Sequence, residues 1–335
     1  MHSDLAFLSS LELSDIDRVT TANLIFDVVD WGHLQPRSLT VGEVNDYFGN
    51  LAEKYSSNDD IGSQGVRSVL AESPRYSALS LASVTGKVYS DLWSSFDDVE
   101  YFDKTLELLQ TRFTANAISI EKFSSCLDAG CGSGRYSVAL KKMNPHMSVT
   151  GLDVSSDAIN FGRQMAKRKG VEVSFQTGSV LDLPFEDESF DFVFSNGVLH
   201  HTSSTEQGLR EINRILKPGG GCWLYLYGGK GALFWDIVEC CRAILRDVPQ
   251  EYTQNIMAEI GFEAGKIFHR CDFFYVPTNR RYLESEVTAM LENSKFSRWH
   301  RLERDVGHGW DEILWNHPNT SLLFGEGEMK FWVQK

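Results

Sequence analysis

The sequence predicts an α/β fold with a mainly parallel, seven-stranded sheet, helices on both faces and an antiparallel last strand. From about residue 124 onward, short apolar segments alternate with helical segments, and this rhythm is typical of a parallel sheet covered on both faces. Residues 325–335 alternate between polar and apolar after a glycine turn, which is typical of a strand. We expect strands at about 124–129, 148–153, 172–176, 190–195, 221–227, 298–304 and 328–334.

Two further segments are predicted outside this sheet. Residues 1–115 are polar and mostly helical in pattern, and we expect them to form a cap or lid. The core occupies 116–228 and continues in 279–335, whereas 229–278 is a partly helical insertion rich in aromatic residues. Because open α/β sheets bind ligands at the carboxyl ends of their strands, we expect both segments to cap that edge.

The composition indicates a soluble, cytoplasmic protein. Of the 335 residues, 42% are hydrophobic and 23% are charged, as in ordinary globular domains. No apolar run approaches the ~18 residues that a membrane span requires, and Asp4 stands where a signal peptide would be basic. None of the six cysteines forms a CxxC pair, so we expect neither a metal site nor a disulfide.

The charge of the chain argues against nucleic acid as a partner. The formal net charge is −14, whereas a surface that tracks phosphates needs clustered Lys and Arg. The densest basic runs, at 141–142 and 163–169, are short and lie on predicted helices, where a solvated helix face explains them. The oligomeric state is left open, with a homodimer as one alternative.

The most informative segment is a glycine-rich loop after the first predicted strand. In Cys-Leu-Asp-Ala-Gly-Cys-Gly-Ser-Gly-Arg-Tyr, residues 126–136, glycine recurs at alternate positions before a helix that begins near Arg135. Glycine lets the backbone approach a ligand closely, and the N–H groups at a helix start bind polar groups. The spacing Asp-x-Gly-x-Gly-x-Gly differs from the Gly-x-Gly-x-x-Gly of dinucleotide folds. Asp128, at the strand end, suits a ligand that carries an ammonium group.

A second acidic strand end follows about twenty residues later, in Val-Thr-Gly-Leu-Asp-Val-Ser, residues 149–155. A carboxylate there, Asp153, can accept two hydrogen bonds from a ribose diol. The alternative is that Asp153 caps the next helix. The sequence spacing of Asp153 from the glycine loop favours the contact with the ribose.

Three further segments complete a pattern. They are 175–185, then 190–201, which ends in Asn-Gly-Val-Leu-His-His, and then 211–220, Glu-Ile-Asn-Arg-Ile-Leu-Lys-Pro-Gly-Gly. In this order and spacing, the five segments resemble the class I S-adenosylmethionine (SAM)-dependent methyltransferases, most closely the methyltransferase type 11, or UbiE-like, branch. The resemblance is strong over 125–227 and looser up to residue 335. It implies a Rossmann-like fold and SAM as the cofactor.

The resemblance also implies which residues bind SAM. The glycine loop would lie under the methionine part, Asp153 would hold the ribose, and Val154 would pack on the adenine. Ser179 and Val180 would lie at the adenine edge, and Asn196 near the sulfonium. The implied cofactor-binding residues are Asp128, Gly130, Cys131, Gly132, Gly134, Arg135, Asp153, Val154, Ser179, Val180, Asn196 and Tyr89.

Three of these assignments have alternatives. The family commonly has Asp at the position of Ser179, so the adenine contact here is uncharged or shared with Asp182. Arg135 either meets the SAM carboxylate or simply occupies the first helical turn. Tyr89 precedes the core where the resembling enzymes have a helical lid over SAM, but with Trp93 at four-residue spacing it also fits core packing.

The candidate catalytic residues are His200 and His201, just past the fourth strand. SAM carries a methyl group on a positive sulfur, so the protein must align a nucleophile, and a base is optional. The alternative is that both histidines hydrogen-bond loop backbone and shape the pocket.

These features together predict methyl transfer to a small-molecule metabolite in an enclosed pocket. Methylation of a macromolecule, either tRNA or a protein, is the first alternative. A SAM-binding regulatory protein without turnover is the second. The intact segment 128–134 together with Asp153 argues against a degenerate site.

Overall fold

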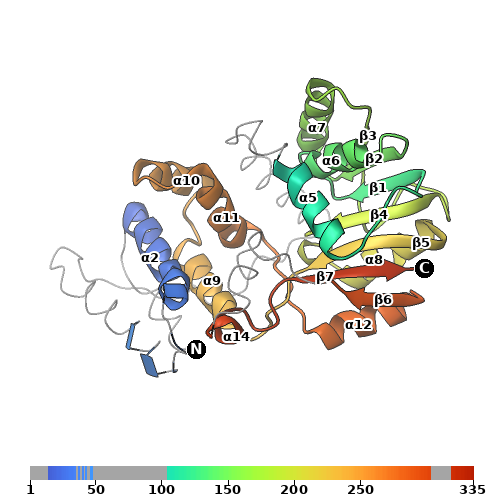
Figure 1. Cartoon of the computed structure of the whole chain (residues 1–335). Coiled ribbons are helices and arrows are strands. Elements are labelled where there is room, and N and C mark those ends of the chain that lie inside the picture. Colours follow the sequence, from blue (N-terminus) through green and yellow to red (C-terminus); the bar gives the residue numbers. More distant parts are fainter. Residues whose placement is uncertain are drawn as a thin grey trace. The chain divides into compact units, whose positions relative to one another are not determined.

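The computed structural model describes residues 14–34, 104–302 and 318–335, with single positions 37, 40, 42, 43, 46 and 47. The chain forms two compact units (Figure 1). The sheet unit comprises Tyr76–Lys230, Val276–Ile313 and Glu326–Lys335. The helical unit comprises Met1–Arg75, Gly231–Tyr275 and Leu314–Gly325.

The sheet unit contains one seven-stranded sheet of order β3-β2-β1-β4-β5-β7-β6 (Figure 1). Neighbours among β1 to β5 pair in parallel, whereas β7 is antiparallel to both β5 and β6. This confirms the predicted α/β sheet with its antiparallel last strand. The strands are β1 (Ser125–Ala129), β2 (Ser148–Asp153), β3 (Ser174–Thr177), β4 (Phe190–Asn196), β5 (Leu216–Leu226), β6 (Arg298–Arg301) and β7 (Met329–Gln334).

Strand β5 begins earlier than the sequence predicted. The prediction started it at residue 221, after the Pro-Gly-Gly turn, but Leu216 already pairs with Phe190 of β4. The register then shifts between Phe190 and Phe192, and Gly219 adopts a left-handed φ of 75°. The Pro-Gly-Gly segment is therefore an irregularity inside the strand, because a bulge accommodates residues that a regular ladder cannot.

Two hydrophobic layers cover the sheet. On one face, Phe192, Phe194 and Trp223 pack in a cluster with residues of α5 (Lys104–Ala115) and α6 (Arg135–Met143). On the other face, Val193 and Leu224 pack with residues of α8 (Thr205–Ile215) and α12 (Glu284–Asn293). Alternate side chains of each strand thus enter opposite layers, as the period of two requires.

Two further helical elements shape the sheet unit. Helix α7 (Ser156–Arg168) contributes Ile159 and Met165 to a smaller cluster around Phe175. A short 3₁₀ helix, Leu199–His201, follows β4. Helix α5, which the predicted boundaries placed in the N-terminal cap, contributes Leu109 and Phe113 to the sheet core.

The helical unit holds α2 (Asp15–Leu34), α9 (Leu233–Ile244), α10 (Gln250–Glu259), α11 (Ala264–Tyr275) and α14 (Thr320–Phe324). The ring of Phe26 contacts Phe234 and Phe274 edge to face at 5.8 and 5.5 Å. Arg270, 1% exposed, donates to the side chains of Asn23 and Asp27. These aromatic residues of the insertion form a core of their own. The cap or lid role of 1–115 and 229–278 remains a prediction.

None of the described helices is both long and apolar enough to cross a membrane.

Candidate active site

The predicted cofactor residues that the structure describes lie at or beside the carboxyl ends of the parallel strands β1 to β4. Asp128 lies in β1, Asp153 ends β2 and Asn196 ends β4. Strand β1 lies between β2 and β4, so the order of the sheet reverses beside it. Ligands of open α/β sheets bind at this switch point, outside the carboxyl ends of the strands.

Asp128 is an almost fully buried acid that accepts a hydrogen bond from a serine hydroxyl. It is 2% exposed, and Ser137 of α6 donates to its Oδ2 at 2.6 Å. Burial raises the pKa of Asp128 to about 7, and the negative charge of Asp153 adds to this rise, against the hydrogen bond from Ser137. The carboxyl group therefore titrates near neutral pH and would ionise more readily beside a cationic ligand.

The glycine loop is attached to the end of β2 by its backbone. The N–H groups of Gly130 and Cys131 both donate to the carbonyl of Leu152, at 2.8 and 2.9 Å. Gly130 has a φ of 81°, and a Cβ atom there would lie 2.4 Å from Val198. Because both the backbone angle and the contact exclude a side chain, only glycine lets this loop pack against the segment that follows β4.

The remaining loop residues differ in what their side chains do. Cys131 is buried, and its side chain packs with Val138 and Phe175, so any ligand contact comes from its backbone. Gly134 precedes α6 with a φ of 77°. The guanidinium of Arg135 lies 4.8 Å from the ring of Tyr136, which holds it over the first turn of α6.

Asp153 joins the glycine loop to the start of the next helix. Its Oδ2 accepts from the N–H of Gly132 and its Oδ1 from the N–H of Ser155, both at 2.9 Å. The backbone of Val154 also stabilises the charged form. A carboxylate has about four acceptor positions, so capacity remains for a further donor. The predicted alternative of a helix cap is wrong for the side chain, because Ser155 caps α7 by accepting from Ala158. The next residue, Val154, is 38% exposed, which leaves an apolar surface beside the carboxylate.

At the predicted adenine edge, Ser179 and Val180 face different surroundings. Val180 is 5% exposed, and its side chain belongs to the core. Ser179 is half-buried, and its hydroxyl accepts from the N–H of Leu181 at 3.1 Å. Just before them, the N–H of Gly178 donates to the carbonyl of Asp153 at 2.9 Å. This bond ties the edge directly to the end of β2.

Asn196 is oriented by a residue that the sequence analysis did not single out. The indole N–H of Trp223, a fully buried residue of β5, donates to Asn196 Oδ1 at 2.9 Å. Because Oδ1 accepts the hydrogen bond from Trp223, the amide nitrogen of Asn196 points away from the indole and keeps its N–H groups as donors.

His200 is fully buried and its tautomer is set by the backbone. The N–H of Tyr227 donates to His200 Nδ1 at 3.2 Å, so a neutral ring carries its hydrogen on Nε2. Among the residues that the structure describes, that nitrogen has no hydrogen-bond partner. Burial, with a smaller effect from His201, lowers the pKa of His200 well below its usual range. The ring stacks on Tyr227 with centroids 3.7 Å apart.

His201 has the opposite arrangement. Its Nδ1 lies 2.7 Å from the carbonyl of Thr278, and since a carbonyl only accepts, Nδ1 carries the hydrogen. The two adjacent rings lie edge to face at 4.2 Å. Tyr89, the remaining predicted site residue, lies outside the described residues.

Sequence reasoning missed the supporting residues Ser137, Val198 and Trp223. Ser137 is the residue with a usable signal, because it is a polar residue in the first turns of a helix beside a buried strand. The roles of Val198 and Trp223 depend on contacts across strands and leave no local pattern. Within the described part of the chain, no group of three or more His, Cys, Asp or Glu could hold a metal ion.

A sheet of this order, with a glycine loop after β1 and an acid at the end of β2, defines a class I SAM-dependent methyltransferase. A family model described as a methyltransferase domain matches residues 120–292, more than half of the chain. The chain therefore belongs to this methyltransferase family. The predicted methyltransferase class is confirmed, and SAM is the cofactor expected of this family.

Similar proteins fall in the same class. A demethylmenaquinone methyltransferase from Listeria welshimeri is 31% identical over 137 residues, 40% of this chain and 58% of the relative. Another, from Staphylococcus aureus, is 37% identical over 105 residues, 31% of this chain and 43% of the relative. The chain thus matches about half the length of these relatives.

Solved structures with a similar fold include a SAM-dependent methyltransferase from Thermotoga maritima, with 18% identity and a TM-score of 0.46 over 76% of this chain and 99% of that one. The YcgJ protein from Bacillus subtilis has 20% identity and a TM-score of 0.45 over 70% of this chain and 98% of that one.

The raised pKa of Asp128 predicts a pH-dependent stability. The folded protein keeps this proton up to about pH 7, whereas the unfolded chain releases it near 3.8. Between these values the folded state binds more protons, so this group lowers the free energy of unfolding as pH rises. We expect a loss of roughly 3 kcal/mol between pH 4 and pH 7, at 1.36 kcal/mol per pKa unit.

Urea unfolding of the ligand-free protein and of Asp128→Asn across this range measures the effect. The variant cannot ionise, and its amide oxygen can still accept from Ser137. Its stability should fall less steeply with pH than that of the parent. Parallel pH profiles for the two proteins would contradict the assignment.

Proposed function

We propose that the protein transfers the methyl group of SAM to a small-molecule metabolite. The observation that carries the proposal is the pair of carboxylates, Asp128 and Asp153, on either side of the glycine loop. This arrangement suits a ligand with an ammonium group, a sulfonium group and a ribose diol. A small acceptor is supported by two relatives named for demethylmenaquinone and by the net charge of −14, which repels polyanions.

In this proposal, each residue of the site binds or orients one part of the reactants. The glycine loop and Asp128 hold the methionine part, Asp153 holds the ribose, and Val154 covers one face of the adenine. Ser179 and the backbone of Val180 bind the adenine edge. SAM supplies a methyl group on a positively charged sulfur, so the protein mainly aligns the acceptor atom for in-line attack.

The two histidines are proposed to differ in role. His200 carries a hydrogen on Nε2 and can only donate there. His201 donates from Nδ1 to Thr278, so in its neutral form Nε2 is the nitrogen that can take a proton. We therefore assign His200 as the donor to an acceptor group of the substrate, and His201 as the base where the substrate must lose a proton.

The first test concerns Asp153. Asp153→Ala should weaken SAM binding by about 1.5–3 kcal/mol, the usual value of a hydrogen bond to a charged group. Asp157→Ala is the matched control, because Asp157 is an exposed acid in the first turn of α7, four residues further on. Isothermal titration calorimetry compares the three proteins. Equal affinity of folded Asp153→Ala and the control would exclude the ribose contact.

The size of the acceptor is tested with radiolabelled SAM in cell extract. We expect label in the fraction below the cut-off of a dialysis membrane, and formation of S-adenosylhomocysteine. Label in protein or in nuclease-sensitive material would replace the proposal with the macromolecular alternative. Binding of SAM without any S-adenosylhomocysteine would favour a regulatory protein.

The donor role of His200 is tested with His200→Asn. The Asn oxygen can still accept from the Tyr227 N–H, but the Nε2–H is lost. Turnover of the labelled acceptor fraction should fall about tenfold or more, as for a lost hydrogen bond in a catalytic site, with SAM affinity unchanged. Wild-type turnover in this variant would leave His200 with a structural role alone.

A further inference from the structure

Glu211 and Arg214, from the Glu-Ile-Asn-Arg segment, have no role in the function proposed above. They lie three residues apart in α8 and face the irregular segment 178–189 that connects β3 to β4. This segment carries the proposed adenine edge, and within it the structure shows a single isolated bridge, between Ser179 and Asp182. Its backbone must therefore find hydrogen-bond partners outside a regular ladder.

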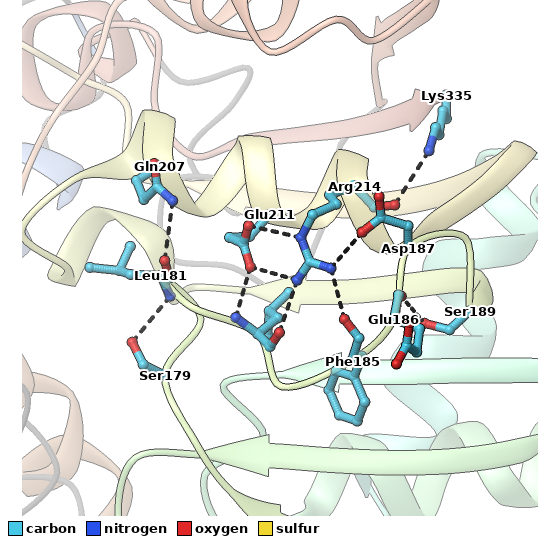
Figure 2. A network of polar contacts seen from close by, with 11 residues as sticks. Ser179, Leu181, Phe185, Glu186, Asp187, Ser189, Gln207, Glu211, Arg214 and Lys335 are labelled. Carbon is cyan, nitrogen blue, oxygen red and sulfur yellow. Dashed lines mark hydrogen bonds and ion pairs between the residues drawn. The ribbon is translucent and has the colours of Figure 1, made fainter.

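The side chain of Arg214 supplies the partner for two carbonyls of this segment, and Figure 2 shows its contacts. Its Nε donates to Glu211 at 3.0 Å, one terminal nitrogen donates to the carbonyl of Phe185 at 2.7 Å and to Asp187 at 2.9 Å. The other donates to the carbonyl of Leu183 at 2.9 Å and to Glu211 at 2.8 Å. A guanidinium has five N–H groups, so every donor of Arg214 is used within this one cluster.

Glu211 completes the arrangement from the same helix. Its carboxylate accepts from the N–H of Leu183 at 2.8 Å, so both backbone groups of Leu183 bind this side-chain pair. The hydrogen bonds from Arg214 hold the pKa of Glu211 below its usual range, against the effect of burial, and Glu211 and Asp187 raise that of Arg214. Each partner therefore favours the charged form of the other.

The same contacts continue toward the adenine edge. Gln207, seven residues before Arg214 on α8, donates to the carbonyl of Leu181 at 3.3 Å. The N–H of Leu181 in turn donates to the hydroxyl of Ser179 at 3.1 Å (Figure 2). One helix thus holds the segment at residues 181, 183, 185 and 187, and the position of the Ser179 hydroxyl follows from these attachments.

We infer that Arg214, together with Glu211, is a positioning residue. The pair fixes the segment that binds the adenine edge of SAM. The inference rests on the proposed placement of adenine at Ser179 and Val180. Without the guanidinium, the carbonyls of Leu183 and Phe185 lose their partner and the carboxylate of Glu211 loses its counter-ion. The segment then shifts, because buried polar groups that lose partners move to find new ones.

The experiment compares the binding of S-adenosylhomocysteine with that of S-inosylhomocysteine, which has a carbonyl in place of the adenine amino group. In Arg214→Gln, affinity for S-adenosylhomocysteine should fall about tenfold, and the preference over the inosyl compound should shrink toward one. Arg214→Lys should recover only part of both, since an ammonium has three donors and no planar fork. A general loss of stability would instead lower the affinity for both ligands equally.

Arg210→Gln is the matched control. Arg210 lies one turn earlier on α8, has a half-exposed side chain and pairs with Glu206 and Gln207 on its own helix. It should bind both ligands within about twofold of the parent. Near-ultraviolet circular dichroism verifies folding. If Arg214→Gln does not fold, Asp187→Ala serves instead, because it removes one of the five bonds by truncating a side chain that is 74% exposed. This variant should also reduce the preference for S-adenosylhomocysteine over the inosyl compound. An unchanged preference would overturn the inference.

Ser179→Ala separates this inference from the proposal on which it rests. If Ser179→Ala reduces the preference for S-adenosylhomocysteine and folded Arg214→Gln does not, the positioning role is wrong and the adenine placement stands. If neither variant changes the preference, or the parent protein has none, the placement of adenine is itself wrong and the inference fails with it.

Discussion

The site depends on the alignment of two neighbouring strand ends. Strands β1 and β2 run parallel, with Ala129 opposite Leu152. This register brings the glycine loop against the last residues of β2, where Leu152 and Asp153 accept three of its N–H groups. A shift by one residue would turn the buried side chain of Leu152 to the other face of the sheet. The burial of one leucine and the shape of the loop are therefore set by the same constraint.

The two acids beside this loop make the ligand-free site electrostatically unfavourable. Burial raises the pKa of both Asp128 and Asp153, and their charges oppose each other. A buried carboxylate without a counter-charge costs free energy that a cation can recover. A cationic cofactor thus favours the ionised form of both acids, and its binding stabilises the folded chain by mass action.

Much of the fold could be predicted from the sequence because its signals are local. Alternating apolar segments predicted the strands. The position of Asp153 at the end of a predicted strand indicated it as a candidate ribose-binding residue. The start of β5 was missed because Leu216 joins the sheet through a bulge that no periodicity announces. The tautomer of His200 depends on the Tyr227 N–H, which is 27 positions away in the chain. The hydrogen bonds of Arg214 likewise form only when the backbone of residues 183–187 is in place. Local pattern predicts elements, whereas these features arise from contacts between elements.

The position of β7 has a consequence for the order of folding. In the described sheet, β6 precedes β7 along the chain but pairs with β7 alone. β6 can therefore join the sheet only through β7, either after β7 has paired with β5 or together with it as an antiparallel pair. Pairing between segments distant in sequence requires closure of a long loop and is slow. Before it forms, the open side of β5 is an unpaired strand edge, the kind of surface through which partly folded chains associate. The docking of β7 is thus the step that covers the edge of β5 and moves the edge of the sheet outward.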